Sequence, residues 1–463
     1  MAPRVTPVLE PAFRPAVLAR RAFQRAAEES GRPVPLRIAL EQADGSVFRS
    51  ELLLLPPDHP EAGANRFFAE RHLKFLLWSR GGHRIYLAGP EELADTLGRH
   101  YALESTGRFD ANMMGDRIYG RPFEVLHCAE DELPEEKLRV QSLGGHLDGC
   151  RIGFDLGGSD RKVAAVQDGK VLFSDETVWD PIPQSDPQWH FDQIMDSLRK
   201  AAKHLPRVDA IGGSAAGVYV NNRVRVASLF RGVPEELFRS RVKDLFLELK
   251  REWNNIPFEV VNDGEVTALA GAMELREGGV LGIALGTSTA GGYVTPEGVL
   301  TSWLDELAFV PVDYRPDAPL DEWSKDLGCG AKYFSQQCVG RLTDVAGIKV
   351  DPEMPLPEVL KHVQKLMAEG DYRARKIYET IGTIFGYTLA HFADFYALRH
   401  VLLLGRVTSG EGGQIIHDGA RAVLETEFPE LAARVKIHLP KDETAKRHGQ
   451  AIAAASLPVV ERP

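Results

Sequence analysis

The stretch FDLGGSDRKVAAV, residues 154–166, predicts two β-strands joined by a turn of two glycines and a serine. An acid, Asp155, stands directly before that turn. Glycines let the backbone approach a ligand closely, and successive N–H groups in such a turn can form a concavity that binds anions. A carboxylate at Asp155 can hold a magnesium ion through water while the turn amides receive phosphate oxygens. The turn residues are Gly157, Gly158 and Ser159. A tight hairpin with an incidental acid is the alternative.

Strands and helices alternate from Arg151 onward in two similar runs. The first run opens with three consecutive strands between residues 151 and 176, followed by a helix at 189–205. The second opens with a hairpin at 280–300 and closes with a strand, a helix, a strand and a helix. This alternation is typical of α/β folds, so we expect a duplicated α/β architecture.

A second glycine-rich loop lies in ALGTSTAGGYV, residues 284–294. Its amides and hydroxyls could face a polyphosphate, since no bulky side chain stands in the way. The candidate residues are Gly286, Thr287, Ser288, Gly291 and Gly292. A small-residue hairpin without a ligand is the alternative. A third segment, VLLLGRVTSGEGG at 401–413, predicts a buried strand that ends at Gly405, where the base and ribose of a nucleotide can lie. An ordinary loop explains that segment equally well.

Two polar residues, Asn262 and Asp263, end the strand of VVNDGEVTALAG and precede a helix. Sites in α/β folds are usually built at such carboxyl ends of strands. A carboxylate at Asp263 can accept the proton of a hydroxyl that attacks a phosphoryl group, while the amide of Asn262 orients another hydroxyl. Alternatively, Asp263 simply caps the helix by accepting hydrogen bonds from its free N–H groups.

The first 149 residues predict a small α+β domain of unknown role. We expect a hairpin at 36–55 with its turn at Asp44-Gly45, an amphipathic helix at 65–78, and further short strands and helices. An acidic, proline-containing stretch and a glycine-rich stretch then indicate a linker before residue 150.

Composition narrows the class of protein. The chain has 463 residues, which is too long for one ordinary core. No apolar run reaches the roughly 20 residues that span a bilayer, and the N-terminus lacks the apolar stretch of a secretory signal, so we expect a cytoplasmic protein without membrane contact. The formal charge of −11 disfavours nucleic acid as a partner. Four cysteines match no disulfide framework and no common zinc pattern.

Taken in order, these motifs resemble the ROK family of sugar kinases and sugar-responsive repressors, over roughly residues 151–458. That family belongs to the actin-like sugar-kinase superfamily, whose members have two duplicated, ribonuclease-H-like α/β lobes. The resemblance implies an α/β fold with one lobe at 150–275, a second at 276–463, and the extra α+β domain at 1–149. It leaves the oligomeric state open, with a homodimer as one option.

The resemblance also assigns roles to individual residues. Asp155 to Ser159 look like the first phosphate motif, with ATP and magnesium as the implied cofactors, and 286–292 look like the second. Asp263 would be the catalytic base, with Asn262 in the sugar site. The segment IGGSAAGVYVNNRV resembles the loop that lines the sugar pocket, which adds Ser214 and Ala215. The turn that begins at Gly405 resembles the adenosine-binding element.

One family feature is incomplete in this sequence. Family members often carry Glu-x-Gly-His followed by a zinc loop; here ELAFVPVD keeps Glu306 but has Phe309 in place of the histidine. Only GCG at 328–330 is similar to the zinc loop, and two thiols cannot complete a four-ligand structural site, so we expect no zinc. Glu306 either binds sugar hydroxyls or is an acid that faces solvent.

The resemblance implies an enzyme: an ATP- and magnesium-dependent kinase that phosphorylates a hydroxyl of a sugar or sugar-like polyol in a cleft between two lobes. One alternative is a non-catalytic sugar-sensing regulator, although the N-terminal segment shows no convincing helix-turn-helix. The other is an actin-like ATPase that couples hydrolysis to a change in a partner.

Overall fold

A five-stranded sheet organises the chain between residues 150 and 262. The computed structural model describes residues 2–138, 144–439 and 443–460. The strand order is β11 (Phe258–Asn262), β8 (Ala210–Ala215), β5 (Cys150–Leu156), β6 (Asp160–Gln167) and β7 (Lys170–Val178). Strands β5, β8 and β11 are parallel neighbours, whereas β6 and β7 are antiparallel. The carboxyl ends of the three parallel strands therefore meet at one edge.

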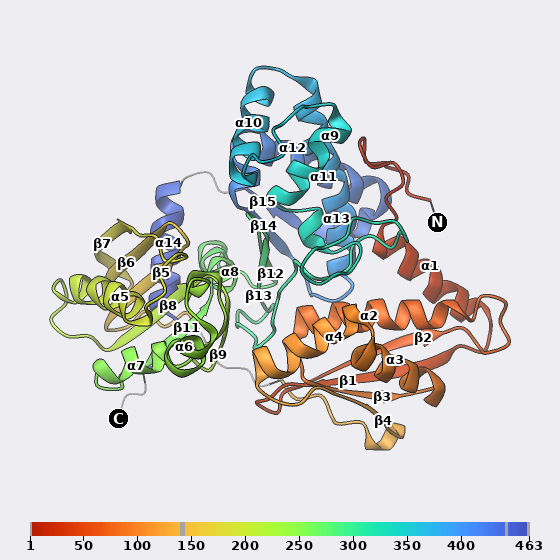
Figure 1. Cartoon of the computed structure of the whole chain (residues 1–463), viewed down its shortest axis with the longest axis horizontal. Coiled ribbons are helices and arrows are strands. Elements are labelled where there is room, and N and C mark those ends of the chain that lie inside the picture. The colour runs from red at the N-terminus through yellow and green to blue at the C-terminus, as the bar shows by residue number, and fades with distance from the viewer. Residues whose placement is uncertain (1, 139–143, 440–442, 461–463) are drawn as a thin grey trace. The chain divides into compact units, whose positions relative to one another are not determined.

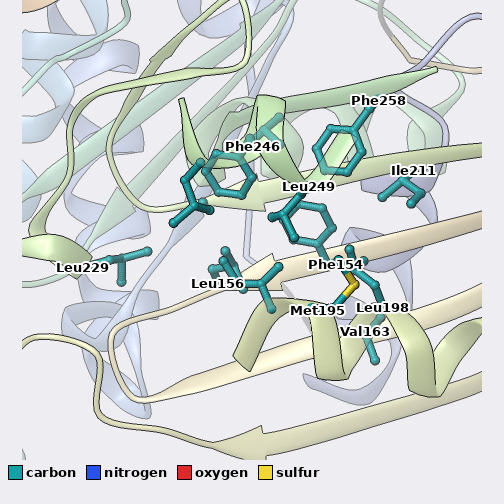
Figure 2. Close-up of a cluster of buried hydrophobic side chains, with 14 of the residues drawn as sticks. Phe154, Leu156, Val163, Met195, Leu198, Ile211, Leu229, Phe246, Leu249 and Phe258 are labelled. Carbon is teal, nitrogen blue, oxygen red and sulfur yellow. The ribbon is translucent and has the colours of Figure 1, made fainter. Parts of the chain in front are cut away.

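An apolar core fixes that edge from one face of the sheet (Figure 2). Helices α5 (Pro187–Ala202) and α7 (Leu245–Glu252) contribute to it. The ring of Phe154 on β5 stacks on Phe246 of α7, with centroids 6.1 Å apart. Phe258 of β11 is equally buried beside them. Burying one such side chain contributes roughly 1.5–3 kcal/mol, so the strand ends rest on a rigid support.

Helix α14 (Glu443–Ala455) packs closely against the strands β5 and β8. A Cβ atom at Gly153 would lie 2.1 Å from the carbonyl oxygen of Ala451, and one at Gly212 would lie 1.7 Å from that of Ala454. Only glycine fits at these two positions. The buried Arg151 secures the segment after the helix, because its guanidinium donates to the carbonyl oxygen of Pro458 at 2.8 Å.

The N-terminal region forms a four-stranded sheet covered by helices (Figure 1). The strand order is β2 (Val47–Leu54), β1 (Val34–Glu41), β3 (Arg84–Ala88) and β4 (Glu124–His127). The helices are α1 (Ala16–Glu29), α2 (Ala64–Arg80), α3 (Glu91–Leu103) and α4 (Ser105–Asn112). The predicted hairpin and its turn are confirmed. The prediction that α2 is amphipathic is wrong: every residue from Phe68 to Arg80 is buried, charged ones included.

The second run of strands forms another sheet. Its order is β13 (Thr289–Val294), β12 (Val280–Leu285), β14 (His400–Leu404) and β15 (Lys436–His438). Its helices are α9 (Gln336–Ala346), α10 (Leu356–Ala368), α11 (Tyr372–Phe392), α12 (Glu411–Glu427) and α13 (Pro429–Arg434). Helices α11 and α12 approach closely at Gly382 and Gly386, where a Cβ atom would lie under 3 Å from α12. Glycine at these two positions lets the helices pack closely.

Two segments of unit 2 are interrupted. Residues 235–253 do not form one helix, and their regular part is α7. Residues 208–220 contain two strands, β8 and β9 (Val218–Val220), and β9 pairs with β10 (Arg223–Val226). Asn221 and Asn222 form the turn between them with φ of 52° and 59°, a conformation that asparagine tolerates.

The chain divides into two compact units. Unit 1 comprises Met1–Arg139, Ile283–Gly291 and Trp303–Leu439, and unit 2 comprises Val140–Gly282, Gly292–Ser302 and Pro440–Pro463. The N-terminal region thus shares a unit with most of the second run of helices and strands. The domain boundaries predicted after residues 149 and 275 stay predictions. None of the described helices is long and apolar enough to cross a membrane.

Candidate active site

The strand ends of unit 2 bring three of the candidate segments together. The register pairs Asp155 with Ser214 across β5 and β8, and Ser214 with Val261 across β8 and β11. Asp263 follows two residues later, as the first residue of helix α8 (Asp263–Leu275). The first glycine turn, the middle strand and the Asn-Asp pair therefore lie at the same edge of the sheet.

Asp155 is a half-buried carboxylate with two partners. The hydroxyl of Ser214 donates to its Oδ1 at 2.8 Å, and the ammonium of Lys162 lies 3.4 Å from its Oδ2. Burial raises the pKa of Asp155, and the charge of Lys162 opposes that shift. The carboxylate is thus held in one orientation at the start of the glycine turn.

Lys162 was not identified from the sequence as a site residue. It stands opposite Asp155 in the register of β5 and β6, and its ammonium also lies 2.8 Å from Oδ1 of Asp160. The side chain keeps about a quarter of its surface exposed, at 25%. The sequence pattern did not indicate it: a three-residue turn at 157–159 would place Arg161 opposite Asp155, whereas the structure pairs Leu156 with Arg161 and Asp155 with Lys162. A cation at this position can attract phosphate oxygens.

The helix cap at the end of β11 is Asn262, so the expectation that Asp263 is the capping residue is wrong. The Oδ1 of Asn262 accepts a hydrogen bond from the N–H of Gly264 at 2.7 Å. The N–H of Asn262 in turn donates to Oε2 of Glu265 at 2.9 Å. The Nδ2 of Asn262 donates to the carbonyl oxygen of Gly217 at 2.7 Å. The amide of Asn262 therefore joins α8 to the loop after β8. Its predicted place in a sugar site stays a prediction.

Asp263 is the first residue of α8 after this cap, and its carboxylate is not needed to cap the helix. Its Oδ1 accepts only a longer bond from the N–H of Gly264, at 3.1 Å. Burial, followed by the negative charge of Asp155, raises the pKa of Asp263 to about 6. Tyr219 on β9 lies near enough for the charge of Asp263 to raise the tyrosine pKa, after burial. A carboxyl group with a pKa close to neutrality suits proton transfer to and from a hydroxyl.

The first glycine turn leaves its backbone accessible. Gly158 and Ser159 are exposed, and a Cβ atom at Gly158 would meet nothing closer than 4.0 Å. Trp179 holds the turn from behind, since its indole N–H donates to the carbonyl oxygen of Gly157 at 2.7 Å. The turn thus has a fixed shape and an open outer side, as an anion-binding turn requires.

The second glycine loop lies in unit 1 beside the turn after β14. Thr287 and Ser288 are exposed, and the N–H of Gly286 donates to the carbonyl oxygen of Ser288 at 2.9 Å. Gly405 has a φ of 98°, and a Cβ atom there would lie 2.3 Å from the carbonyl oxygen of Leu285. The structure therefore brings Gly405 against the strand that leads into the loop. Their predicted contacts with nucleotide stay predictions.

Three other predicted site residues have clear structural surroundings. A Cβ atom at Gly291 would lie 2.6 Å from the carbonyl oxygen of Asp305, so packing alone demands glycine there. Ser214 and Ala215 are buried at 2% and 0% exposure, with Ser214 turned to Asp155. The structure places this pair beneath the strand edge, and direct sugar contacts by either residue stay a prediction.

Glu306 belongs to an irregular segment, residues 301–329, that isolated bridges hold in place. Its backbone N–H donates to the carbonyl oxygen of Trp78 on α2 at 2.9 Å. Phe309, which takes the place of the expected histidine, is buried against the indole of Trp78 with centroids 4.2 Å apart. Glu306 itself is half-buried. No pattern in the sequence indicated that the N-terminal region supports this residue.

The donor set of this edge fits a hydrated magnesium ion. Magnesium in proteins usually takes one or two carboxylates and keeps waters and substrate phosphates as its other ligands. Asp155 supplies one carboxylate at the edge of an amide-lined turn. Within residues 2–138, 144–439 and 443–460, no group of three histidine, cysteine or acidic side chains could hold a metal ion. The expected absence of structural zinc stays a prediction that elemental analysis can check.

Comparisons with known proteins identify solved structures that share this fold. No protein-family model and no curated protein matches the sequence. The solved structure of the ROK hexokinase from Thermus thermophilus matches with a TM-score of 0.51 at 19% identity, covering 66% of this chain and 97% of that chain. The fold is that of the ROK proteins. A ROK family transcriptional regulator, a homolog of the E. coli MLC protein, matches with a TM-score of 0.53 at 18% identity, covering 70% and 82%.

The ROK fold confirms the predicted architecture of two actin-like α/β lobes. The hexokinase covers 66% of this chain, so about a third of the chain has no counterpart in it. At these identities the likeness establishes the fold, and ROK proteins of this fold include both a hexokinase and a regulator.

Proposed function

We propose that this protein is an ATP-dependent kinase that transfers a phosphoryl group to a hydroxyl of a sugar or sugar-like polyol. The observation that carries the proposal is the pair of carboxylates at the strand edge of unit 2. Asp263 has a pKa of about 6, whereas Asp155 is bonded by Ser214 and Lys162 beside an open glycine turn. One carboxylate is suited to proton transfer and the other to a phosphate-bound cation.

The chemistry follows from these positions. The carboxylate of Asp263 takes the proton from the acceptor hydroxyl, whose oxygen forms a bond to the γ-phosphorus of ATP. The bond from that phosphorus to the bridging oxygen breaks, and ADP leaves with the electron pair. The amides of residues 157–159 and the ammonium of Lys162 bind phosphate oxygens, as the exposed turn and the exposed part of Lys162 permit. Magnesium held by Asp155 would neutralise phosphate charge.

The finer assignments form part of the same proposal. Glu306 and Asn262 contact the acceptor, and the loop Gly286–Ser288 with Gly405 binds nucleotide. The protein works in the cytoplasm, where its four cysteines, all free thiols in the structure, would stay reduced. A sugar-sensing regulator is the second candidate, because a regulator shares the fold. The raised pKa of Asp263 favours catalysis over sensing alone.

A screen of ADP release tests the proposal. Purified protein is mixed with ATP and magnesium and with sugars, amino sugars and polyols one at a time. We expect one chemical class of acceptor to stimulate ADP release, with formation of its phosphate ester. If no acceptor stimulates release but sugars bind, the regulator is correct; release that is independent of any acceptor would instead indicate an ATPase.

The variant Asp263→Asn links the activity to the site. Because Asn262 provides the helix cap, the substitution leaves the start of α8 intact. Turnover should fall by about 100- to 10,000-fold, the usual worth of general-base catalysis, while ATP affinity and the melting temperature stay close to wild type. A fully active Asp263→Asn protein would remove this residue from the mechanism. The companion variant Asp155→Asn should raise the magnesium concentration needed for half-maximal rate.

A further inference from the structure

Helix α2 of the N-terminal region runs beneath the segment that carries Glu306. The carboxyl end and the middle of α2 both contact this segment, and all the residues involved belong to unit 1. Residues 301–329 have no regular secondary structure, so contacts with other elements must fix their conformation. Several of these contacts come from α2.

The carboxyl end of α2 holds the backbone of Glu306 and of the residue before it. The N–H groups of Asp305 and Glu306 donate to the carbonyl oxygens of Ser79 and Trp78, at 3.1 and 2.9 Å. These carbonyls lie in the last turn of the helix, where oxygens lack helical partners. The segment thus completes the hydrogen bonding of the helix end.

Arg80, the last residue of α2, anchors the same stretch. Its guanidinium lies 3.7 Å from the ring centroid of Trp303 and 4.3 Å from that of Tyr396. The hydroxyl of Tyr396 donates to Asp305 Oδ1 at 2.6 Å. A fully buried cation is attracted to the faces of aromatic rings, so Arg80 fixes the position of Trp303, and Tyr396 fixes that of Asp305.

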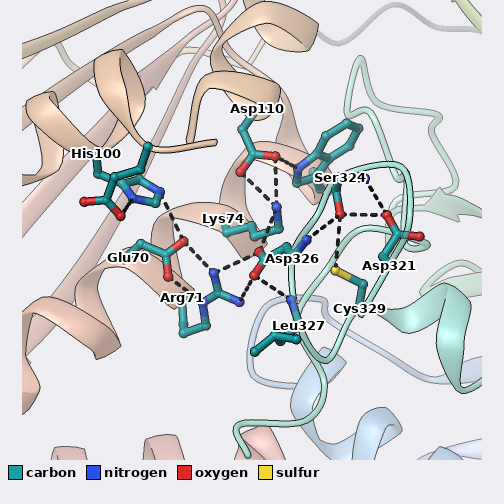
Figure 3. A network of polar contacts seen from close by, with 12 residues as sticks. Glu70, Arg71, Lys74, His100, Asp110, Asp321, Ser324, Asp326, Leu327 and Cys329 are labelled. Atoms are coloured by element: carbon teal, nitrogen blue, oxygen red, sulfur yellow. Dashed lines mark hydrogen bonds and ion pairs between the residues drawn. The ribbon is translucent and has the colours of Figure 1, made fainter. Parts of the chain in front are cut away.

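The middle of α2 holds the far end of the segment through buried charges (Figure 3). Asp326 lies 2.9 Å from Nη2 of Arg71 and 3.0 Å from Nζ of Lys74. Lys74 is also bonded to both oxygens of Asp110, at 2.9 and 3.0 Å, and Arg71 to Glu70. All five side chains are almost inaccessible to water. Arg71 and Lys74 hold the pKa of Asp326 well below its usual range, against the effect of burial.

The charge balance of this group shows what Asp326 contributes. Glu70 and Asp110 already neutralise Arg71 and Lys74 within the N-terminal region, so Asp326 is an additional negative charge from the irregular segment. Buried ion pairs add little net stability, since desolvation offsets their attraction, but they penalise every arrangement that leaves a charge unpaired. The pairing therefore selects one position of the segment on α2.

We propose that α2 is the positioning element of the Glu306 segment, with Arg71 and Lys74 acting through Asp326 as positioning residues for the phosphoryl acceptor. The N-terminal region then contributes to the acceptor site by positioning the segment that carries Glu306. This inference rests on the proposed function only in that Glu306 contacts the acceptor.

The variant Asp326→Asn tests the inference, because it removes the charged link to the segment and leaves Arg71 and Lys74 neutralised by Glu70 and Asp110 within the N-terminal region. Hydrogen exchange of the folded protein should become faster in residues 303–329, with β1–β3 unchanged. The KM for the acceptor should rise by about 10- to 100-fold, as expected for small misplacement of a binding group, while the KM for ATP stays the same. The conservative variant Asp326→Glu should restore part of both properties.

Arg84→Gln is the matched control. It removes ion pairs from the same N-terminal sheet, to Glu41 at 3.1 Å and Glu124 at 2.6 Å, and none of its partners lies in the 303–329 segment. Exchange and KM should match wild type. Unchanged exchange at 303–329 in Asp326→Asn overturns the inference, and so does an equal rise in both KM values. If Asp326→Asn does not fold, Lys74→Arg, which keeps the charge and changes the geometry, is judged by the same readings. Hydrogen exchange decides the matter even if the screen shows no kinase activity.

Discussion

Asp155 and Asp263 share one strand edge but have different neighbours. Asp155 accepts a hydrogen bond from Ser214 at 2.8 Å and lies 3.4 Å from the ammonium of Lys162, whereas Asp263 accepts a single bond, at 3.1 Å, from the amide next to it. Burial raises the pKa of both carboxyl groups, and the charge of Asp155 adds to the effect at Asp263. The two carboxyl groups therefore differ in their partners: Asp263 is placed to exchange a proton, and Asp155 is held by a hydroxyl and an ammonium group.

The pH dependence of the rate should report this difference. Because the base must be ionised to accept a proton, we expect kcat/KM to fall as pH drops through about 6, the pKa of Asp263. In Asp155→Asn the residual rate should fall only at lower pH, since one cause of the raised pKa is gone. A pH profile for each protein, at saturating magnesium, checks both expectations. An acid limb that stays in Asp263→Asn would assign it to another group.

Asp305 allows a prediction about stability. Burial raises its pKa to about 6 in the folded protein, against roughly 3.9 in an unfolded chain. The folded state therefore binds this proton more tightly, so ionising Asp305 weakens the fold as pH rises from about 4 to 6. Asparagine can still accept the Tyr396 hydroxyl and tolerates the φ of 48°.

We expect Asp305→Asn to be more stable than wild type at pH 7.5, by about 2–3 kcal/mol for two pKa units. The difference should disappear near pH 4, where wild-type Asp305 is protonated. Denaturant unfolding at the two pH values measures it. A variant less stable at pH 7.5 would mean that the charge of Arg80 outweighs the burial of Asp305.

At the scale of elements, the glycines of the two loops differ: some have room for a larger side chain, whereas others are required by internal packing. A Cβ atom at Gly286 would lie 3.7 Å from the nearest atom, an ordinary contact, whereas at Gly291 it would lie 2.6 Å from a backbone oxygen. Gly286→Ala and Gly158→Ala should therefore fold normally and bind ATP more weakly in calorimetry. Gly291→Ala should lower the melting temperature. Unchanged ATP affinity in both of the first two variants would remove the loops from the nucleotide site.

Local patterns predicted many of these elements. The glycine turn after Asp155, the hairpin at Asp44-Gly45 and the helix after Asp263 follow from turn residues and periodicity, and the structure contains all three. Lys162 was outside the reach of the same reasoning, because the predicted three-residue turn places Arg161 opposite Asp155, whereas the structure pairs Asp155 with Lys162.

Contacts between distant segments could not be predicted in this way. Asp326 and Lys74 are 252 positions apart, and no local signal in α2 shows which carboxylate neutralises its cations. Charged residues on α2 therefore indicated a solvated face, although they are buried. The cap at Asn262 was missed for a different reason: Asn262 and Asp263 are both good caps, and only the backbone geometry selects one.

At the scale of the whole molecule, the N-terminal region is part of unit 1. Its helix α2 buries charges against residues 305–329, and Glu10 pairs with Arg341 on α9 at 2.7 Å. Deleting residues 1–139 would leave Asp326 and Arg341 without these partners and expose the apolar surface that α2 covers.

We expect the fragment 140–463 to be insoluble or unfolded, as circular dichroism and a thermal melt would show. The same fragment produced together with a separate chain of residues 1–139 should regain a cooperative transition if the two pieces associate. A fragment 140–463 that melts cooperatively by itself would show instead that residues 1–139 are an independent domain.

Helix α14 has a consequence for how the protein is made. The chain passes between the units after residues 139, 282, 291, 302 and 439, and α14 returns to cover Gly153 and Gly212. The ribosome makes β5 roughly 300 residues before that helix, a delay of about 15–60 s at ordinary rates of synthesis. During that interval the face of β5 and β8 that α14 later covers lacks this helix. A nascent chain must therefore be protected by chaperones or be completed quickly. A stop codon that removed only α14 would leave this surface exposed to solvent throughout the lifetime of the protein.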